Sequence, residues 1–573
     1  MVPMTPYDAR VTHASSLERR EPADPRRYPP LFAGLPVVVW VLCAVFVATM
    51  LMWSVTKGTY DSPDERQHVA AGLYWSEFHE WPRFKEMGMM LNVMRSYDLV
   101  HSAPHHTSAA TARPERPSFA DLTGETAVSE KTRNQMSQHP PLYYVMLGQL
   151  HDVLPVDTAA DLEVWIMRLM SIVLMAPLPL LAAALARRLG ASRPIVISVA
   201  AAVALIPGIA SVGGAVNNDN LLNAASGWVL LGIGCVLMGD LRSRTAIWIG
   251  VALAVALMAK AFALPIAAGV ALAYVVAMVR FRSIRSGLIS LAIVVGVAAL
   301  GGWWWVQNLV RYGTLQPAGH GAALADGPLT ALEALPVYAE RFTRVFFTRF
   351  WAGMDPAGLD HPVFWISAST SILVLGILFV GLTFRRRSLP KGAGVDFMVL
   401  LTPFMLALVI LLYSTYRITM NTGYAAGIQG RYMYCVVIGG IVVTAFAVAA
   451  MLPKRWHPIV MLAFTLTGLA FTTWRVAFAL NNAWAPGEPG IVTHFEALFA
   501  WSPLPYAVSV GIFVIFVLAA ITATALVVRE YVMLRRPDVA TGSTDDESAI
   551  RPAPTDAAGH VSEREEVGLT PGR

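Results

Sequence analysis

The sequence has few charged residues and almost no cysteine. Asp, Glu, Lys and Arg make up 14% of its 573 residues and there are 3 cysteines, whereas 55% of the residues are hydrophobic and the mean hydropathy is +0.53. This scarcity of charge excludes a soluble globular domain. Cys43, Cys235 and Cys435 all lie in apolar runs. They are expected to be buried hydrophobic residues, which excludes a disulfide framework and a cysteine-based metal site.

What the chain has instead is a series of apolar runs of membrane-spanning length. The runs are Leu35–Thr56, Leu162–Ala186, Ile195–Val216, Leu221–Met238, Ile247–Met278, Leu288–Val306, Val363–Phe384, Phe397–Tyr416, Met433–Leu452, Ile459–Phe478 and Tyr506–Val528. The fifth run is too long for one helix and is interrupted by Lys260 and Pro265, so it predicts two short or broken helices. The sequence therefore predicts an all-α, polytopic integral membrane protein with about twelve transmembrane helices.

Lysine and arginine predict the orientation of these helices. They gather in the N-terminal tail and in alternate connections: Arg187/Arg188/Arg193, Arg242/Arg244, Arg280/Arg282/Arg285, Arg385/Arg386/Arg387, Lys454/Arg455 and Arg535/Arg536. Positive charge concentrates on the cytoplasmic side of the plasma membrane, so both termini are expected there, without a cleavable signal peptide. Residues 1–34 are then a basic cytoplasmic tail, 35–530 the transmembrane domain and 531–573 a disordered cytoplasmic tail.

The connections on the other side are long, particularly residues 57–161 and 311–362. Loops of this size between spans are usually functional, and no separate soluble domain is large enough to carry chemistry. We therefore expect an active site on the outer face of the membrane.

Five short polar stretches lie at this outer boundary. They are "SPDERQH" with Asp64, Glu65 and His68, "HPPLYY" with His139, "NNDN" with Asn218 and Asp219, "NLVRYG" with Arg311, and "QGRYMY" with Gln429 and Arg431. Each has an ordinary structural explanation: acids in the first turn of a helix, an interfacial helix anchored by Tyr143 and Tyr144, or a polar turn. Their common depth favours one shallow site, where arginine suits a lipid-linked phosphate because its planar fork makes paired hydrogen bonds.

Lys260 is the oddest charge in the apolar runs, because it lies about 13 residues into its own run. An ammonium is costly there unless it faces a cavity or lies near a helix end, where the side chain can reach the interface. We favour contact with a donor phosphate or an acidic residue over this interfacial alternative.

The five stretches, in this order between spans, resemble the GT-C superfamily of membrane glycosyltransferases, over roughly residues 35–528. The likeness is greatest to the bacterial membrane-protein family with a PDE-x-x-H element and a late QGRY element, and is more distant to protein O-mannosyltransferases and aminoarabinose lipid A transferases. The resemblance implies a polyprenyl-phosphate sugar donor, an envelope glycan, lipid or protein acceptor, and inversion at the anomeric carbon. It also implies an acidic general base in the first outer loop, at Asp64 or Glu65. The segment 96–137 matches nothing in this family.

Two alternatives remain open from the sequence. Asp64 and His68, together with His101, His105 or His106, could hold a divalent metal, although the spacing fits no tight ligand signature and no cofactor is required. Twelve spans and an intramembrane lysine are also compatible with a transporter or flippase, although no internal repeat is visible. Nothing in the chain indicates a nucleic-acid partner. The sugar, the acceptor, the length of the lipid and the oligomeric state are not specified by these patterns.

Overall fold

The computed structural model describes residues 31–102, 115–124, 126–317, 328–353, 361–385, 388–389 and 392–535. The first part of the chain forms α1 (Val37–Thr56), α2 (Glu65–Phe78), β1 (Gly88–Met90), α3 (Leu91–Ser102), β2 (Val128–Arg133), η2 (Gln135–Gln138), α4 (Leu142–Asp152), α5 (Ala160–Met175), α6 (Leu178–Arg188), α7 (Arg193–Ala204) and α8 (Pro207–Gly213). The remainder forms α9 (Asp219–Leu237), α10 (Ser243–Leu257), η3 (Ala261–Ala263), α11 (Leu264–Phe281), α12 (Ile284–Tyr312), α13 (Ala331–Trp351), α14 (His361–Thr383), α15 (Ala393–Thr422), η6 (Gly430–Met433), α16 (Tyr434–Met451), η7 (Lys454–Trp456), α17 (His457–Ala483), α18 (Ile491–Trp501) and α19 (Tyr506–Arg535).

The all-α membrane architecture is confirmed, but the count of about twelve spans is not. Within the described residues, 10 helices are long and apolar enough to cross a membrane, or up to 11 if the pair α7 and α8, bent by 54°, counts as one span. The predicted division of the run at 247–278 is correct. However, α10 has only 15 residues and falls below spanning length.

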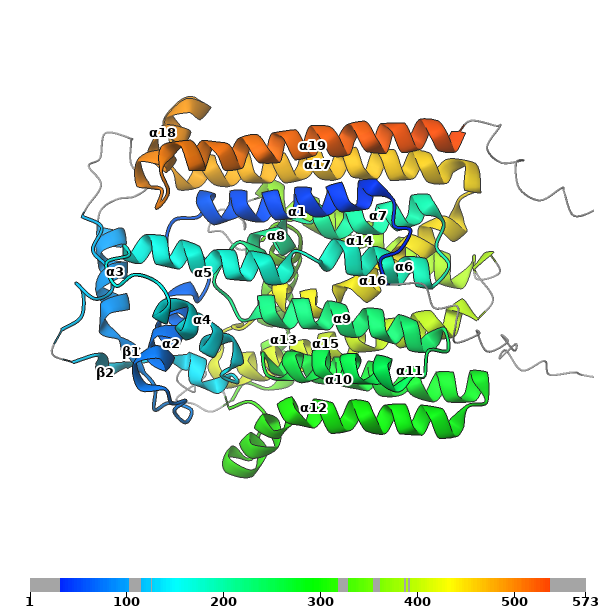
Figure 1. Cartoon of the computed structure of the whole chain (residues 1–573), viewed down its shortest axis with the longest axis horizontal. Helices are drawn as coiled ribbons and strands as arrows, with labels where there is room; N and C mark the ends of the chain where they lie inside the picture. The colour runs from blue at the N-terminus through cyan, green and yellow to red at the C-terminus, as the bar shows by residue number, and fades with distance from the viewer. Residues whose placement is uncertain are drawn as a thin grey trace, which may run out of the picture.

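The long helices run roughly side by side, and the short elements gather at one end of the bundle (Figure 1). There α2, α3, α4 and the antiparallel pair β1–β2 lie together, whereas α1 begins and α19 ends at the opposite end. Residues 1–30 and 536–573 lie outside the described part of the chain, so the two predicted tails are largely untested. The last helix continues to Arg535, past the boundary predicted at residue 530.

Burial differs strongly between the spans. The apolar window of α9 is 94% buried inside the protein, whereas that of α14 is 17% buried. A helix that exposes apolar side chains around most of its circumference faces lipid, and one buried all round forms the core. The central position of α9 places its N-terminal residue, Asp219, inside the protein rather than against lipid.

The first long loop, residues 57–161, is largely structured. α2 packs against α4, with Gly72 and Gly148 at the crossing. A β-carbon on Gly148 would meet the backbone oxygen of Gly72 at 2.8 Å, so only glycine allows this approach. The predicted interfacial anchoring of α4 is wrong: Tyr143 and Tyr144 are fully buried in protein, because their hydroxyl groups find partners there.

The second long loop contains α13, which sequence analysis did not predict. Thr330 and Glu333 form a capping box that fixes its first turn. The helix places Ala334, Tyr338 and Phe346 in the protein interior. Its exposed residues include the apolar Leu332 and Leu335 and the charged Arg344. Its last turn packs against η6, which brings the second outer loop onto the "QGRYMY" segment.

Candidate functional site

Four charged side chains form a continuous series of ion pairs where the first loop meets the bundle. Arg431 donates from Nη2 to Oδ2 of Asp64 at 2.9 Å, and its Nε lies 3.2 Å from Oδ2 of Asp219. The other oxygen of Asp219, Oδ1, accepts from Lys260 Nζ at 2.7 Å. We call these four residues the charge chain. Two acids and two bases make it electrically neutral as a whole.

Asp64 is the end of the charge chain that reaches solvent. Its side chain is 36% exposed, against 2% for Arg431, 2% for Asp219 and 7% for Lys260. Burial alone would raise the pKa of Asp64, but the charge of Arg431, reinforced by their hydrogen bond, outweighs it and holds that pKa below its usual value. The Asp64 carboxylate is therefore ionised at neutral pH, and on its exposed side Oδ1 accepts a long hydrogen bond of 3.4 Å from Gln135 Nε2.

The backbone at Asp64 is left-handed, with φ 60° and ψ 7°. The conformation follows from the local sequence: the Glu65 amide bonds Ser62 O in a tight turn, and the His68 amide bonds Asp64 O to start α2. A left-handed residue costs roughly 1–2 kcal/mol, least for Asp and Asn. The turn directs the Asp64 and Glu65 side chains to different clusters.

The residues of "QGRYMY" have separate roles in placing Arg431. A β-carbon on Gly430 would meet the Phe350 backbone nitrogen at 2.4 Å, so glycine allows η6 to pack directly on α13. The ring of Tyr432 lies 4.2 Å from the ammonium of Lys260, a favourable cation–π distance. The Tyr434 hydroxyl donates to Phe350 O at 2.7 Å, which ties the end of α13 to α16.

The residues of "NNDN" divide between structural and charge-bearing roles. Asn217 Oδ1 accepts from the Asp219 amide, and Asn220 donates to Val212 O and Ala215 O, so both hold the turn into α9. Asn218 Nδ2 donates to Ala259 O at 3.2 Å, beside Lys260. The polar-turn explanation therefore holds for the asparagines, and only Asp219 enters the charge chain.

His68 and His139 are buried beside the charge chain. His68 Nδ1 lies 3.1 Å from the Tyr144 hydroxyl, and the two rings stack at 5.8 Å. Burial lowers the pKa of His68 to about 3 and holds the pKa of His139 well below its usual value. The positive charges of Arg431 and Lys260 act in the same direction on both, which shows that both rings lie within range of the charge chain. Both histidines are neutral at pH 7.

Glu65 belongs to a different cluster, although it follows Asp64 directly. It is fully buried, and its two oxygens accept from Arg168 at 2.9 Å and 2.6 Å. The amides of Tyr60 and Val216 complete its hydrogen bonds. Arg168 also donates to the carbonyls of Ser54, Lys57 and Gly58. We call these contacts the Glu65 cluster; it fastens the first loop to α1, α5 and the turn before α9.

Three predicted residues take positions that sequence alone did not resolve. Lys260 is not within a helix but in the break between α10 and η3, and it contacts an acid, Asp219, which was one of the two contacts favoured for it. Gln429 lies directly before η6, and its side-chain oxygen is buried without a hydrogen-bond donor among the described residues. Arg311 is exposed on the last turn of α12. Its Nη2 donates to the amide oxygen of Gln307 at 2.6 Å when that amide is turned toward the guanidinium. No described contact joins Arg311 to the charge chain.

Sequence analysis missed Arg349, which lies on α13 next to the charge chain. Its Nη1 donates to Ile428 O at 3.1 Å, just before Gln429. Burial, followed by the charges of Arg431 and Arg341, lowers the pKa of Arg349, so the three guanidinium groups are neighbours. Among the described residues no carboxylate pairs with Arg349. The available signal was the spacing of Arg341 and Arg349, eight residues apart and so on similar faces of one helix.

Among the residues that the structure describes, no group of three or more His, Cys, Asp or Glu side chains is placed to hold a metal ion. His105 and His106, and the side chain of His101, lie outside the described residues, so the alternative metal set that includes them is not tested.

The sequence comparison assigns the chain to a family. Residues 46–440 match the family described as predicted membrane protein DUF2142. The chain belongs to this DUF2142 family. No curated protein matches the sequence.

Solved structures with the same kind of helix arrangement are remote in sequence. ArnT from Cupriavidus metallidurans, bound to undecaprenyl phosphate, is 12% identical with a TM-score of 0.44, over 88% of this chain and 77% of ArnT. The Archaeoglobus fulgidus oligosaccharyltransferase is 13% identical with a TM-score of 0.36, over 81% of this chain and 56% of its own. The Mycobacterium smegmatis arabinosyltransferase EmbB is 13% identical with a TM-score of 0.39, over 89% and 43%.

This chain thus spans about half the length of the last two proteins. By their names, the second is an oligosaccharyltransferase and the third an arabinosyltransferase. Because every TM-score is below 0.5, a mechanism for this chain depends on its own side chains.

Proposed function

We propose that this DUF2142 protein is an inverting glycosyltransferase. It transfers a sugar from a polyprenyl-phosphate donor to a hydroxyl group of a cell-envelope acceptor at the outer boundary of the membrane. Asp64 is the general base. The observation that carries the proposal is the charge chain, which ends in a half-exposed, ionised carboxylate and adjoins an arginine with no carboxylate partner among the described residues.

The charge balance favours an anionic donor. Asp64 and Asp219 neutralise Arg431 and Lys260, so within the described part of the chain Arg349 leaves one positive charge without a carboxylate to balance it. A sugar linked to a lipid through a single phosphate carries one negative charge, which matches this excess. Arg349 is partly buried, and a partly buried guanidinium next to a second one is costly unless an anion balances it. Arginine forms paired hydrogen bonds with phosphate oxygens. Arg349 therefore contacts the donor phosphate directly, and the more deeply buried Arg431 adds its positive charge nearby.

The low pKa of Asp64 determines how it acts as a base. It is ionised before substrate arrives, but it is a weak base toward a free hydroxyl group. The acceptor hydroxyl becomes acidic as its oxygen bonds to the anomeric carbon, and the proton then passes to Asp64 while the bond from that carbon to the donor phosphate breaks. The negative charge that develops on the leaving phosphate faces Arg349 and Arg431.

Glu65 has a positioning role in this proposal and is not the base. All of its hydrogen bonds go to protein groups and its side chain is fully buried, so an acceptor hydroxyl cannot reach it. It fixes the turn from which Asp64 projects.

The test is a transfer assay with the full chain reconstituted in liposomes that carry a radiolabelled polyprenyl-phosphate sugar in the outer leaflet only, mixed with bacterial envelope fractions. We expect label to move from the lipid to a water-soluble or envelope-bound glycan, while the leaflet distribution of the donor stays unchanged. Redistribution of intact donor between leaflets without any new glycoconjugate would replace the enzyme with a lipid transporter. If the amount of donor and its distribution between the leaflets both stay unchanged with every envelope fraction, both functions are contradicted.

A further inference from the structure

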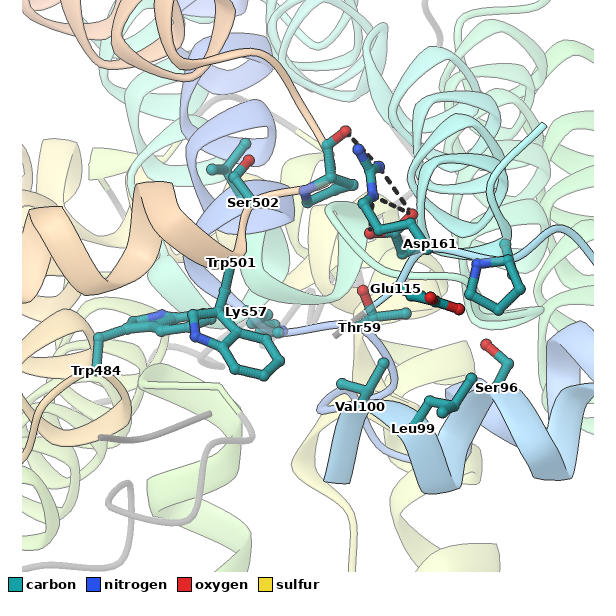
Figure 2. Close-up of a pocket in the computed structure, with 16 residues that line it drawn as sticks. Lys57, Thr59, Ser96, Leu99, Val100, Glu115, Asp161, Trp484, Trp501 and Ser502 are labelled. Carbon is teal, nitrogen blue, oxygen red and sulfur yellow. Dashed lines mark hydrogen bonds and ion pairs between the residues drawn. The ribbon is translucent and has the colours of Figure 1, made fainter. Parts of the chain in front are cut away.

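A pocket with a mixed polar and apolar lining lies beside the first loop, apart from the charge chain. It is a shallow hollow: about 50 Å³ is available to the centres of water-sized molecules, within about 650 Å³ of empty space that includes open solvent. Figure 2 shows Trp484 and Trp501 on one side of it and Ser96, Glu115 and Asp161 on the other. These residues come from five segments far apart in the sequence, all at the end of the bundle that carries Asp64.

The pocket wall is built rather than incidental. Arg116 donates to both oxygens of Asp161 at 2.8 to 3.1 Å and to Pro503 O at 2.8 Å. This one guanidinium fastens the start of α5 to the segment that follows α18. Trp484 donates to Thr56 O at 2.7 Å, which fixes its indole against the end of α1. A site held in this way needs little ordering when a ligand binds.

The chemistry of the lining fits a neutral saccharide. The charges of Lys57 and Arg116 are balanced by those of Glu115 and Asp161, so the pocket has no excess charge to attract phosphate. Indole rings provide an amphipathic surface, and hydroxyl and carboxylate groups accept or donate hydrogen bonds next to it. A sugar ring presents apolar C–H groups on its faces and hydroxyl groups at its edge, which is the complementary arrangement.

The pocket is joined to the proposed base by a short stretch of backbone. Thr59 lines the pocket and Asp64 follows five residues later, so their α-carbons are at most about 18 Å apart. Tyr60 lies between them: its amide donates to Glu65 and its hydroxyl to Ser96, which also lines the pocket. The Glu65 cluster therefore fixes the two sites relative to each other.

We propose that this pocket is a saccharide-binding subsite, which holds a neutral part of the acceptor glycan while the reacting hydroxyl lies at Asp64. That the bound saccharide is the acceptor rests on the proposed function. The occupancy of the pocket by a saccharide does not.

The experiment measures saccharide binding without catalysis. A panel of neutral di- and trisaccharides of hexoses and pentoses is tested by saturation-transfer NMR on the full chain in lipid nanodiscs, with inorganic phosphate as the anionic comparison. Glu115→Gln removes an exposed carboxylate that has no described partner. Trp501→Phe removes an indole N–H that has no acceptor among described residues, so no internal hydrogen bond is lost. Glu130→Gln, an exposed acid on β2 outside the pocket lining, is the matched control.

We expect wild-type protein and the Glu130→Gln control to bind at least one saccharide equally well. Glu115→Gln should weaken that binding about tenfold, the usual effect of losing a hydrogen bond to a charged group. Trp501→Phe should weaken it as well. Binding that survives in both pocket variants, or no saccharide bound by wild type, overturns the subsite. Wild-type protein distinguishes the two proposals: if it binds a saccharide but shows no transfer activity, the proposed function is contradicted and the subsite stands. Asp64→Asn should keep saccharide binding and lose transfer, because Asp64 does not line the pocket.

Discussion

Two clusters of charged side chains start from the same turn, one at Asp64 and the other at Glu65, and they are built differently. In the Glu65 cluster, Arg168 donates two hydrogen bonds to the Glu65 carboxylate. Backbone amides and carbonyls provide the other hydrogen-bond partners of both side chains. In the charge chain, Asp64 is 36% exposed, and Oδ2 of Asp219 and Nε of Arg431 face each other at 3.2 Å without a well-formed hydrogen bond. A complete cluster indicates a structural role. An incomplete one, with an extra arginine beside it, is what a site for an anionic ligand requires before the ligand arrives.

The largest effect on stability should come from the complete cluster. Glu65→Gln leaves Arg168 without its counter-charge in the protein interior, and breaking one partner of a buried pair typically costs about 3–5 kcal/mol. Asp64→Asn should change stability by less than about 1 kcal/mol, because its carboxylate is half-exposed and asparagine tolerates the left-handed backbone. Thermal unfolding of both variants in the same detergent makes the comparison. Equal losses in both would remove the distinction between the clusters.

The next effect concerns donor binding. Arg349→Gln should weaken binding of a polyprenyl-phosphate sugar by about 10- to 100-fold, since a charged hydrogen bond to phosphate is lost. Arg344→Gln is the matched control, on the exposed side of the same helix. Binding is measured by titration of labelled donor into nanodisc-embedded protein. If the two variants bind equally well, Arg349 does not contact the phosphate and the charge-balance argument fails.

A smaller effect lies inside the charge chain. Lys260→Met leaves Asp219 with Arg431 as its remaining ionic partner, so both stability and donor binding should fall. Adding Asp219→Asn removes the unbalanced acid and should recover part of the stability, with a coupling of roughly 0.5–3 kcal/mol. A double-mutant cycle of unfolding free energies measures it. Strict additivity would show that the Lys260–Asp219 contact has no energetic significance.

The smallest expected effect is on the pH dependence of catalysis. Because the pKa of Asp64 is lowered and that of His68 is about 3, Asp64 stays ionised and His68 neutral above about pH 5. The value of kcat/KM should therefore be flat from about pH 5.5 to 7.5. The free energy of unfolding should instead decline as pH falls from about 6.5 toward 3. In this range His68 and His139 bind protons in the unfolded chain, whereas their lowered pKa values keep them neutral in the folded chain. An acid limb in kcat/KM centred near 6.5 would contradict this assignment.

Hydropathy predicted the fold class. Motif order brought together residues that the structure does place in contact, namely Asp64, Asp219, Lys260 and Arg431, whereas Arg311 lies apart from them and the roles of all five stay predictions. Length and apolar content determine a span, and both are local properties of the sequence. The overcount arose where the backbone departs from a straight helix, in the 54° bend between α7 and α8 and in the short α10.

The difference between Asp64 and Glu65 could not be predicted, because it depends on partners far away in the chain. Arg168 is 103 residues from Glu65, and Arg431 is 367 residues from Asp64. Neither partner has a local spacing signal. Arg349 was missed for a related reason. Its helix, α13, was not predicted, and Arg349 comes close to the charge chain only because Gly430 allows η6 to pack on α13.

The most direct test of the account is the turnover of Asp64→Asn at saturating donor. The substitution keeps the shape and backbone conformation of the residue and removes only its ability to take a proton. We expect turnover to fall about 10²–10⁴-fold, as for loss of a general base, with donor affinity unchanged or slightly tighter because Arg431 is less neutralised. Wild-type turnover in folded Asp64→Asn protein would show that Asp64 is not the base and would contradict the mechanism proposed for this DUF2142 member.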